Sequence, residues 1–325
     1  MRIRPCSALL SLGLVVIGAC DAVDAVLPPT STAPEPDRNI VYVGTVGTTT
    51  DIFTIHETTR ALPPFNVTND VAPDNTPSWS KDGKTILFSS ARDGNAEIYT
   101  IKEDGTSPQR LTNNPSADYS PAYSPDESKI VFVREVTGGR PQLFVMNSNG
   151  TNVVNISNNT FNESQPSWSP DGRKIAYASD RDAKFGANTY LEIYTMNPDG
   201  TGVTRLTFHD TGIDYYPSWS PDGTQIAFTT SRTTNPPQCY AFALEIWIMN
   251  ADGSSPRREI NDCYGNANAS WSADGEYLIL QSDRGSPNVP YKWDVWYARV
   301  HQDHIAFRET FIGAAVVPKW RRLRN

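Results

Sequence analysis

A short aromatic motif recurs along the chain at intervals that suit a repeated β-sheet. It begins at Pro77, Pro121, Pro166, Pro217 and Ala269, where it reads Pro/Ala-Ser/Ala-Trp/Tyr-Ser, and a sixth Pro-x-Trp begins at Pro318. The aromatic residues of successive motifs lie 44, 45, 51, 52 and 49 residues apart. Repeats of this length are typical of the blades of a β-propeller.

Each of the first five motifs is followed by signals for three further strands. A turn such as Pro170-Asp171-Gly172 leads into an apolar alternating run such as 174–178. Proline presets φ in the turn, Asp bonds its own backbone and Gly supplies a positive φ, so this is a hairpin. Next comes a third strand, such as 192–196 in the same repeat. An Asp-Gly turn and a fourth strand complete the unit, and residues 109–112 are an example of the fourth strand from an earlier repeat. Four short strands per repeat predict one blade each.

The phase of the repeat predicts how the ring closes. The folded region starts with a second strand (39–44), a third (51–56) and a fourth (65–68), and it has no first strand of its own. Residues 316–321 carry the sixth Pro-x-Trp and can supply that strand from the other end of the chain. We therefore expect an all-β, six-bladed propeller over residues 39–325, closed by the C-terminal strand joining the first blade.

The repeats resemble those of TolB-type propellers, also called PD40 or WD40-like repeats. Their signature runs P-S-W-S-P-D-G-x-x-I-A-F-x-S-D-R-D-G-x-x-E-I-Y, and it recurs five times within residues 39–325, with Tyr123 in place of one Trp and Glu127 in place of one turn Gly. The resemblance implies a fold and not a function, since such blades occur in TolB, peptidase accessory domains, lyases and lipoproteins. TolB itself also has an amino-terminal α/β domain, where we expect only a tether here.

The amino terminus has the pattern of a bacterial export signal. Arg2 and Arg4 precede an apolar run over 8–19 that is too short to span a membrane as a helix. Residues 17–20 resemble a lipobox ending at Cys20. We expect a signal peptide at 1–19, a lipidated Cys20 that opens a flexible Pro-rich tether over 20–38, and a ring facing the periplasm or cell exterior. A plain signal peptide is the alternative.

Charge and cysteine content narrow the partners. Without Arg2 and Arg4 the 28 basic residues become 26 against 36 acidic ones, so the net charge goes from -8 to -10. Such a surface disfavours nucleic acid, whose binding needs clustered Lys and Arg. Besides Cys6 and Cys20, only Cys239 and Cys263 remain. They flank the third and fourth strands of the fifth blade, and an exported compartment allows a disulfide between them.

Two further sets of charged residues recur with the repeat. Arginines end the second strands, and acidic residues or a glutamine begin the third strands. We expect structural ion pairs between these sets, because half-buried charges persist only when they are partnered. The arginines are Arg92, Arg134, Arg181, Arg232 and Arg284, and the third-strand residues are Asp51, Glu97, Gln142, Glu192, Glu245 and Asp294.

A third recurring position lies five residues before each aromatic. It precedes the innermost strands, and it is held by Asp74, Asp118, Glu163, Asp214, Asn266 and Ala315. These residues either cap local turns or form an acidic rim at the mouth of the central channel, where like charges would attract a cation or a basic peptide. Calcium suits oxygen ligands, although the chain has no Asp-x-Asp-x-Asp loop.

Aromatic residues gather in the long connections that we expect on the same face and on the adjoining rim, where Tyr119, Tyr215 and Tyr216 lie next to the acidic positions. The connections between second and third strands are long in the later blades. Aromatics on loops over a rigid scaffold are a common recognition surface, although some must simply pack the loops. The candidates are Tyr119, Tyr215, Tyr216, Tyr240, Tyr291 and Trp293.

The catalytic motifs that we sought do not occur. The chain has no Gly-x-Ser-x-Gly, no Gly-rich phosphate loop and no His-Glu-x-x-His, and His301-x-x-His304 is a weak metal signal. We expect a monomeric, non-catalytic adaptor without a cofactor that receives an envelope protein or peptide at the channel mouth. A carbohydrate-binding or lyase-like propeller is the alternative.

Overall fold

The computed structural model describes residues 39–56, 63–136, 138, 140–182, 190–208, 212–232, 244–260, 264–284, 293–301, 306–308 and 315–320. Their regular structure consists of strands arranged in six antiparallel four-stranded sheets. This confirms the all-β, six-bladed prediction. Within these residues, no helix has the length and apolar character needed to cross a membrane.

Five blades are built from strands that follow one another in sequence. Blade 2 comprises β4 (Asp74–Trp79), β5 (Thr85–Ser90), β6 (Glu97–Lys102) and β7 (Gln109–Arg110), and blade 3 comprises β8 (Asp118–Tyr123), β9 (Lys129–Val136), β10 (Arg140–Asn147) and β11 (Val154–Asn155). Blade 4 comprises β12 (Glu163–Trp168), β13 (Ile175–Ser179), β14 (Glu192–Met196) and β15 (Thr204–Arg205), and blade 5 comprises β16 (Asp214–Trp219), β17 (Gln225–Thr230), β18 (Glu245–Asn250) and β19 (Arg257–Arg258). Blade 6 comprises β20 (Asn266–Trp271), β21 (Tyr277–Ser282), β22 (Asp294–Arg299) and β23 (Ala306–Arg308).

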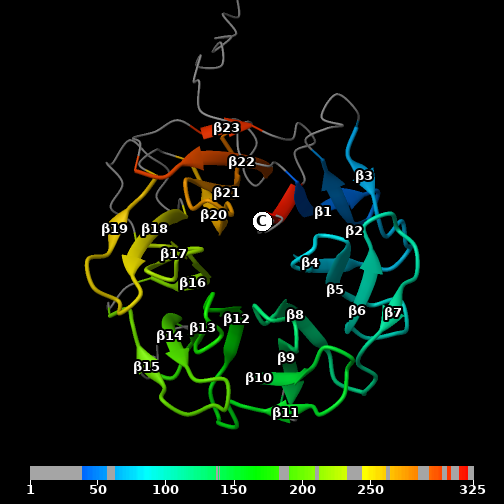
Figure 1. The fold of residues 1–325 in the computed structure, drawn as a ribbon, viewed down its shortest axis with the longest axis horizontal. Coiled ribbons are helices and arrows are strands. Elements are labelled where there is room, and N and C mark those ends of the chain that lie inside the picture. The colour runs from blue at the N-terminus through cyan, green and yellow to red at the C-terminus, as the bar shows by residue number, and fades with distance from the viewer. Residues whose placement is uncertain are drawn as a thin grey trace, which may run out of the picture. The chain divides into compact units, whose positions relative to one another are not determined.

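Blade 1 joins the two ends of the folded chain, as the repeat phase predicts. Its order is β24 (Ala315–Trp320), β1 (Ile40–Val46), β2 (Thr49–Ile55) and β3 (Phe65–Asn66). Strand β24 pairs antiparallel with β1, with Gly44 opposite Ala315 and Ile40 opposite Trp320. Figure 1 shows β24, in red, beside β1 at the centre of the ring. The expected closure by the C-terminal strand is therefore confirmed.

The first strand of every blade lies innermost (Figure 1). Each of these strands contacts the first strands of both neighbouring blades, from β4 round through β20 to β24 and back to β4. The fourth strands are only two or three residues long and lie outermost. Short outer edges limit unwanted pairing with other chains.

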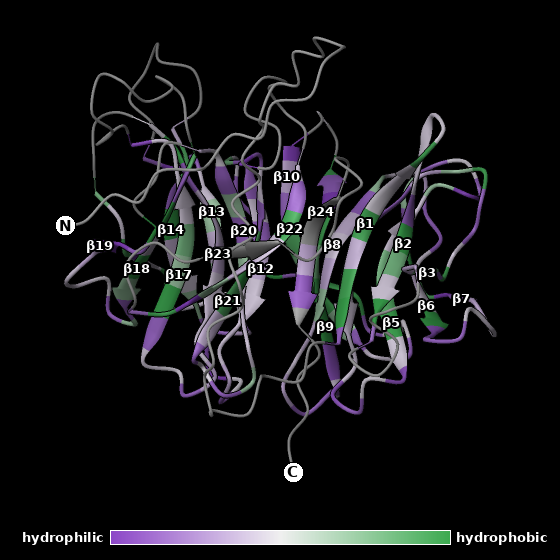
Figure 2. Cartoon of the chain, turned by 90° about the horizontal axis from the view of Figure 1, so that it is seen from above, coloured by the Kyte–Doolittle hydropathy of each residue, from purple (hydrophilic) through white to green (hydrophobic). Residues whose placement is uncertain are grey.

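The core lies between the blades. One buried cluster combines Val41 and Ile52 of blade 1 with Trp79 and Phe88 of blade 2, and similar clusters join later pairs of blades. Another joins blade 6 to blade 1 through residues such as Ile279 and Tyr42. Figure 2 shows apolar colour along the strands and hydrophilic colour at the turns of both faces. Burial between blades therefore holds the ring together.

The repeated motif serves this packing. The tryptophans at its third position in blades 2, 4, 5 and 6 are buried between blades, and Tyr123 of blade 3 is half-buried. The Nε1–H groups of Trp168 and Trp271 donate to Ala122 O at 3.2 Å and Ser218 O at 3.0 Å in the preceding first strand. In the turn that follows, Gly172 takes φ 71°. Glu127 takes φ 58° at the equivalent position, although a glutamate adopts this left-handed conformation less readily than a glycine does.

Candidate functional site

The acidic residues expected around the channel mouth are buried inside the blades. Asp74, Asp118, Glu163 and Asp214 begin the first strands of blades 2 to 5, and all four are fully buried, as is Asn266 in blade 6. Because no solvent reaches their carboxylates, they do not form the exposed acidic rim of the sequence analysis. We correct that expectation here.

These carboxylates hold arginines from the ends of the second strands of their own blades. Arg134 donates from Nε and Nη2 to the two oxygens of Asp118, both at 2.7 Å, and Arg92 Nη2 lies 3.2 Å from both oxygens of Asp74. We call this arrangement the inner clamp. Its other members are Arg181 with Glu163 at 2.7 Å, Arg232 with Asp214, and Arg284 with Asn266 at 3.2 Å.

Aromatic rings pack against the guanidinium groups of the same arginines. The guanidinium carbon of Arg134 lies 5.4 Å from the centroid of Phe132 and 5.0 Å from that of Phe144, on the second and third strands. Cation–π contacts stabilise a cation where solvent is scarce. The same stack recurs with Arg92 over Phe88 and Tyr99, Arg181 over Tyr177 and Tyr194, Arg232 over Phe228 and Trp247, and Arg284 over Trp296.

The third-strand acids pair with the fourth strand instead, which corrects their expected partners. Arg110 contacts Glu97 at 3.0 Å, and we call this arrangement the outer clamp. Each second strand lies between a first and a third strand, so sequence alone left open which carboxylate its arginine reaches. The other outer clamps are Arg205 with Glu192 at 3.1 Å, Arg258 with Glu245 at 3.3 Å, and Asn66 with Asp51 at 2.7 Å.

Sequence reasoning missed the fourth-strand arginines, although they carried a signal. Arg110, Arg205 and Arg258 each follow the third-strand glutamate by 13 residues. Blade 3 departs from the pattern at both positions, with Gln142 on the third strand and Asn155 on the fourth. There the Gln142 amide oxygen accepts from Ser157 Oγ at 3.0 Å. In blade 3, the third-strand carboxylate and the fourth-strand arginine are therefore replaced together.

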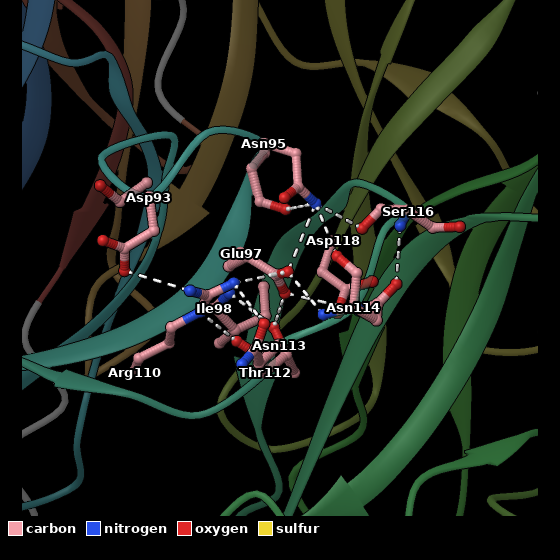
Figure 3. Close-up of polar contacts among 12 residues, drawn as sticks. Asp93, Asn95, Glu97, Ile98, Arg110, Thr112, Asn113, Asn114, Ser116 and Asp118 are labelled. Carbon is pink, nitrogen blue, oxygen red and sulfur yellow. Dashed lines mark hydrogen bonds and ion pairs between the residues drawn. The ribbon is translucent and has the colours of Figure 1, made fainter.

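The two clamps are joined across neighbouring blades by asparagines, as Figure 3 shows for blades 2 and 3. Asn114 donates its backbone N–H to Glu97 at 2.8 Å and its side-chain amide to Asp118 at 2.9 Å. Asn159 repeats this bridge between Gln142 and Glu163. A buried network that satisfies its polar groups fixes one arrangement of the blades.

Burial dominates the electrostatics of the inner clamp. It raises the pKa of Asp74 and of Asp118, while hydrogen bonds and the charge of the paired arginine act in the opposite direction. The hydrogen bonds that Arg134 donates to Asp118 are in turn the largest cause of the raised pKa of Arg134. Groups of this kind are structural charges that are costly to strand without a partner.

The first strands of blades 2 to 6 each contain one irregular residue. Their pairing with the second strands shifts register there, and the residue takes a left-handed conformation. Left-handed backbone is costly for residues other than glycine, so the surrounding sheet must enforce it. The residues are Thr76 (φ 51°), Ser120 (φ 53°), Gln165 (φ 49°), Tyr216 (φ 53°) and Asn268 (φ 55°).

Four of these left-handed residues line a cavity of about 190 Å³ on the axis of the ring: Thr76, Ser120, Gln165 and Tyr216. Prolines that follow them, such as Pro77 and Pro166, line it as well, and the cavity extends to Lys81 and Glu127 in the turns after the first strands. The buried carboxylates do not line it. The described cavity therefore reaches the turn face, opposite the predicted mouth.

The predicted aromatic residues have different environments. Tyr119 and Tyr215 are half-buried and pack against clusters between blades, and burial raises the pKa of Tyr119 to about 12. Tyr216 lines the cavity and lies with its ring centroid 4.9 Å from that of Tyr215. Trp293 lies against Gly265, where a Cβ atom would be 2.9 Å from the indole. Among those that the structure describes, Tyr216 is the one that lines the axial cavity.

The loops between fourth and first strands expose apolar side chains that sequence analysis did not single out. Val71 is 96% exposed and Phe208 is 71% exposed, and Phe161 occupies the loop of blade 3. Arg205 lies 4.8 Å from the ring centroid of Phe208. We call Val71, Phe161 and Phe208 the apolar mouth residues, because these loops lead into the inner ends of the blades.

The remaining predicted sites cannot be placed. Cys20, Cys239, Cys263, Tyr240, Tyr291 and His304 lie outside the described residues, while His301 Nδ1 lies 3.1 Å from Arg257 Nη2. The described part of the chain has no group of three or more His, Cys, Asp or Glu residues that could hold a metal ion. Both carboxylate oxygens of Asp118 accept from Arg134, and calcium at the channel mouth stays a prediction.

The fold and the repeated clamps define a six-bladed β-propeller whose blades derive from one repeat. A family model described as the TolB beta propeller domain matches residues 30–191. A TolB homologue of Chlorobium luteolum is 33% identical over 154 residues, which is 47% of this chain and 33% of that protein. The matched part thus spans about a third of that curated relative.

Solved structures share the ring. A candidate TolB from Agrobacterium tumefaciens superposes with a TM-score of 0.66 at 22% identity, over 89% of this chain and 95% of that one. An oligogalacturonate lyase from Vibrio parahaemolyticus superposes with a TM-score of 0.52 at 16% identity, over 82% and 71%. At these identities the likeness concerns the fold alone. The match of the family model to residues 30–191, together with the TolB homologue, confirms the resemblance to TolB-type β-propeller repeats that the sequence indicated.

Proposed function

We propose that this chain is a binding module of the bacterial cell envelope, and that a protein or peptide partner docks on the apolar mouth residues. The observation that carries the proposal is the exposure of Val71, Phe161 and Phe208 on loops that lead into the first strands. Large apolar side chains held out to water on a rigid scaffold favour a recognition surface. The relatives named TolB support an envelope role.

The clamps support this role through rigidity. Phe208 and Phe161 each follow a short fourth strand, which the outer clamp or its equivalent ties to the third strand. The first strand that comes after each of them begins with an inner-clamp carboxylate. Loops fixed at both ends lose little conformational entropy when a partner binds. An arginine beside an exposed ring, as with Arg205 and Phe208, gives an apolar contact with a polar edge.

We propose no catalytic role. The recurring carboxylates hold arginine or asparagine side chains, so they are engaged in the scaffold and not placed for acid–base chemistry. We also propose that the leader directs export and that lipidated Cys20 anchors the ring at a membrane, facing the periplasm or exterior. Incorporation of labelled fatty acid should disappear in Cys20→Ser and persist in the wild type.

The test of binding compares the two faces of the ring. Envelope extracts are passed over the immobilised wild type, a Val71→Ser/Phe208→Ser variant and a Val203→Ser control, and captured proteins are purified and rebound. Val203 is also exposed, but it follows the Asp199-Gly200 turn at the opposite end of the blade. We expect the mouth variant to weaken rebinding by about tenfold or more and the control to leave it unchanged.

Two results would contradict the proposal. Equal losses in Val203→Ser and in the mouth variant would show that binding does not use this face. Saturable binding on a glycan array, without any protein that rebinds, would favour the carbohydrate alternative. Circular dichroism of each variant checks that the ring is intact before binding is compared.

A further inference from the structure

The blade that closes the ring lacks the inner clamp. Its first strand begins at Ala315, which lies opposite Gly44, and Val46 occupies the position that carries arginine in blades 2, 4, 5 and 6. Alanine, glycine and valine have no charged group. The seam between first and second strands therefore has no carboxylate–guanidinium pair in blade 1, whereas blades 2 to 5 have one.

Close packing around Gly44 leaves no room for a charged side chain at this point of the seam. A Cβ atom at Gly44 would lie 2.7 Å from a ring carbon of Phe53, so a side chain there would require the ring to move. Blade 3 shows what is excluded, because Arg134 occupies the equivalent position directly opposite Asp118. The closing seam relies on backbone pairing and apolar packing instead.

The seam also differs in how its strands are connected. In blades 2 to 6 a short turn joins the first strand to the second, as residues 80–84 join β4 to β5. Strands β24 and β1 lie at opposite ends of the folded chain, so no turn returns β24 to its place once it separates. Among the strands that the structure describes, β24 pairs with β1 alone, from Gly44–Ala315 to Ile40–Trp320.

We propose that β24 exchanges between two copies of this chain, so that each ring is closed by the last strand of the other. A second copy supplies the same strand in the same register, and it restores the buried position of Pro318 and the contacts of β24 with β20, β21 and β4 of the neighbouring blades. Exchange of identical elements creates a dimer at little cost in contacts. This inference stands apart from binding at the mouth.

The experiment measures strand exchange in the purified full chain. Samples are incubated at high concentration, diluted and examined at once by native mass spectrometry and light scattering. We expect a dimer that persists after dilution, because its separation requires both rings to open. The variant Ala315→Asp/Val46→Arg supplies the charges of an inner clamp, and it should lower the rate of exchange by about tenfold.

A matched variant separates strand exchange from general instability. Asp118→Ala removes the inner clamp of blade 3, where a turn joins β8 to β9, so it should destabilise the ring without increasing the dimer. The single change Val46→Arg controls for added charge alone. The proposal is overturned if no lasting dimer forms, if Asp118→Ala raises the dimer, or if the installed pair leaves exchange unchanged in a folded variant.

Discussion

The carboxylates of the inner clamps and those of the turns occupy opposite environments. Asp118 is fully buried against Arg134, and burial raises its pKa. Asp171 lies in the turn after β12 with its side chain 59% exposed, and it accepts hydrogen bonds from Ser169 Oγ at 2.7 Å and Arg173 N at 3.0 Å. The hydrogen bond from Ser169 is the largest cause of its lowered pKa.

The difference shows that recurrence alone does not reveal what a residue does. Both carboxylates recur in blades 2 to 5, yet one set holds the strands of a blade together and the other shapes a local turn. Desolvation makes the buried set costly to disturb, because a half-buried arginine loses its partner with it. Solvent screens the turn set, so its contribution is smaller.

The largest expected effect is therefore at Asp118. Asp118→Ala leaves Arg134 without its carboxylate, and we expect the free energy of unfolding to fall by about 3–5 kcal/mol. Asp171→Ala removes turn hydrogen bonds at the surface and should cost about 1 kcal/mol. Urea titrations followed by tryptophan fluorescence measure both values.

A paired change tests why Asp118 matters. Replacing both partners, as in Asp118→Leu/Arg134→Met, removes the stranded charge and should recover much of the stability that Asp118→Ala loses. If the double variant is less stable than Asp118→Ala, the stability comes from the ion pair itself and not from avoiding an unpaired arginine.

Sequence analysis was sufficient for the ring because the ring depends on a repeated pattern. The spacing of the aromatic motif and the missing first strand together predicted six blades and the position of β24. Burial between blades requires that pattern in every repeat, so the signal is redundant. Even the departure at Glu127 kept the turn, since the residue adopts the left-handed φ of the glycine that it replaces.

The site could be predicted less well because it depends on distances between strands. Arg92 was expected to pair with a third-strand acid, and it instead contacts Asp74 on the first strand. Both carboxylates lie at the same end of neighbouring strands, and alternation cannot distinguish them. The left-handed conformation of Tyr216 has no glycine or turn signal either, so its place in the axial cavity emerged only from the fold.

The outer clamp of blade 2 allows an intermediate test against blade 3. Glu97 accepts hydrogen bonds from Arg110 at 3.0 Å and from Asn114 N at 2.8 Å, so Glu97→Gln should cost about 2 kcal/mol of unfolding free energy. Blade 3 has Gln142 with Asn155 at these positions. Adding Arg110→Asn should therefore recover part of the loss.

The measurement is a double-mutant cycle by urea unfolding. Arg110→Asn alone is the control, since it leaves Glu97 buried without its cation. Additive losses in the double variant would mean that the glutamate and the arginine act independently, and the coincident changes in blade 3 would then have another origin.

The smallest expected effect concerns acid, and it distinguishes the two sets by sign. Hydrogen bonds, above all from Ser220, lower the pKa of Asp222 below the usual aspartate value of 3.8. Its contribution to stability is therefore present above pH 3.8 and is lost as the pH falls through the lowered pKa. The raised pKa of Asp118 acts oppositely, because its contribution is present below 3.8 and is lost as the pH rises through the raised value. The difference in unfolding free energy between the wild type and Asp222→Asn, measured from neutral to acidic pH, should therefore shrink on acidification by less than about 1 kcal/mol. The difference between the wild type and Asp118→Asn should change in favour of the wild type over the same titration. If the two stability differences changed with pH in the same direction, burial would not account for the opposite pKa shifts of the buried and the turn carboxylates.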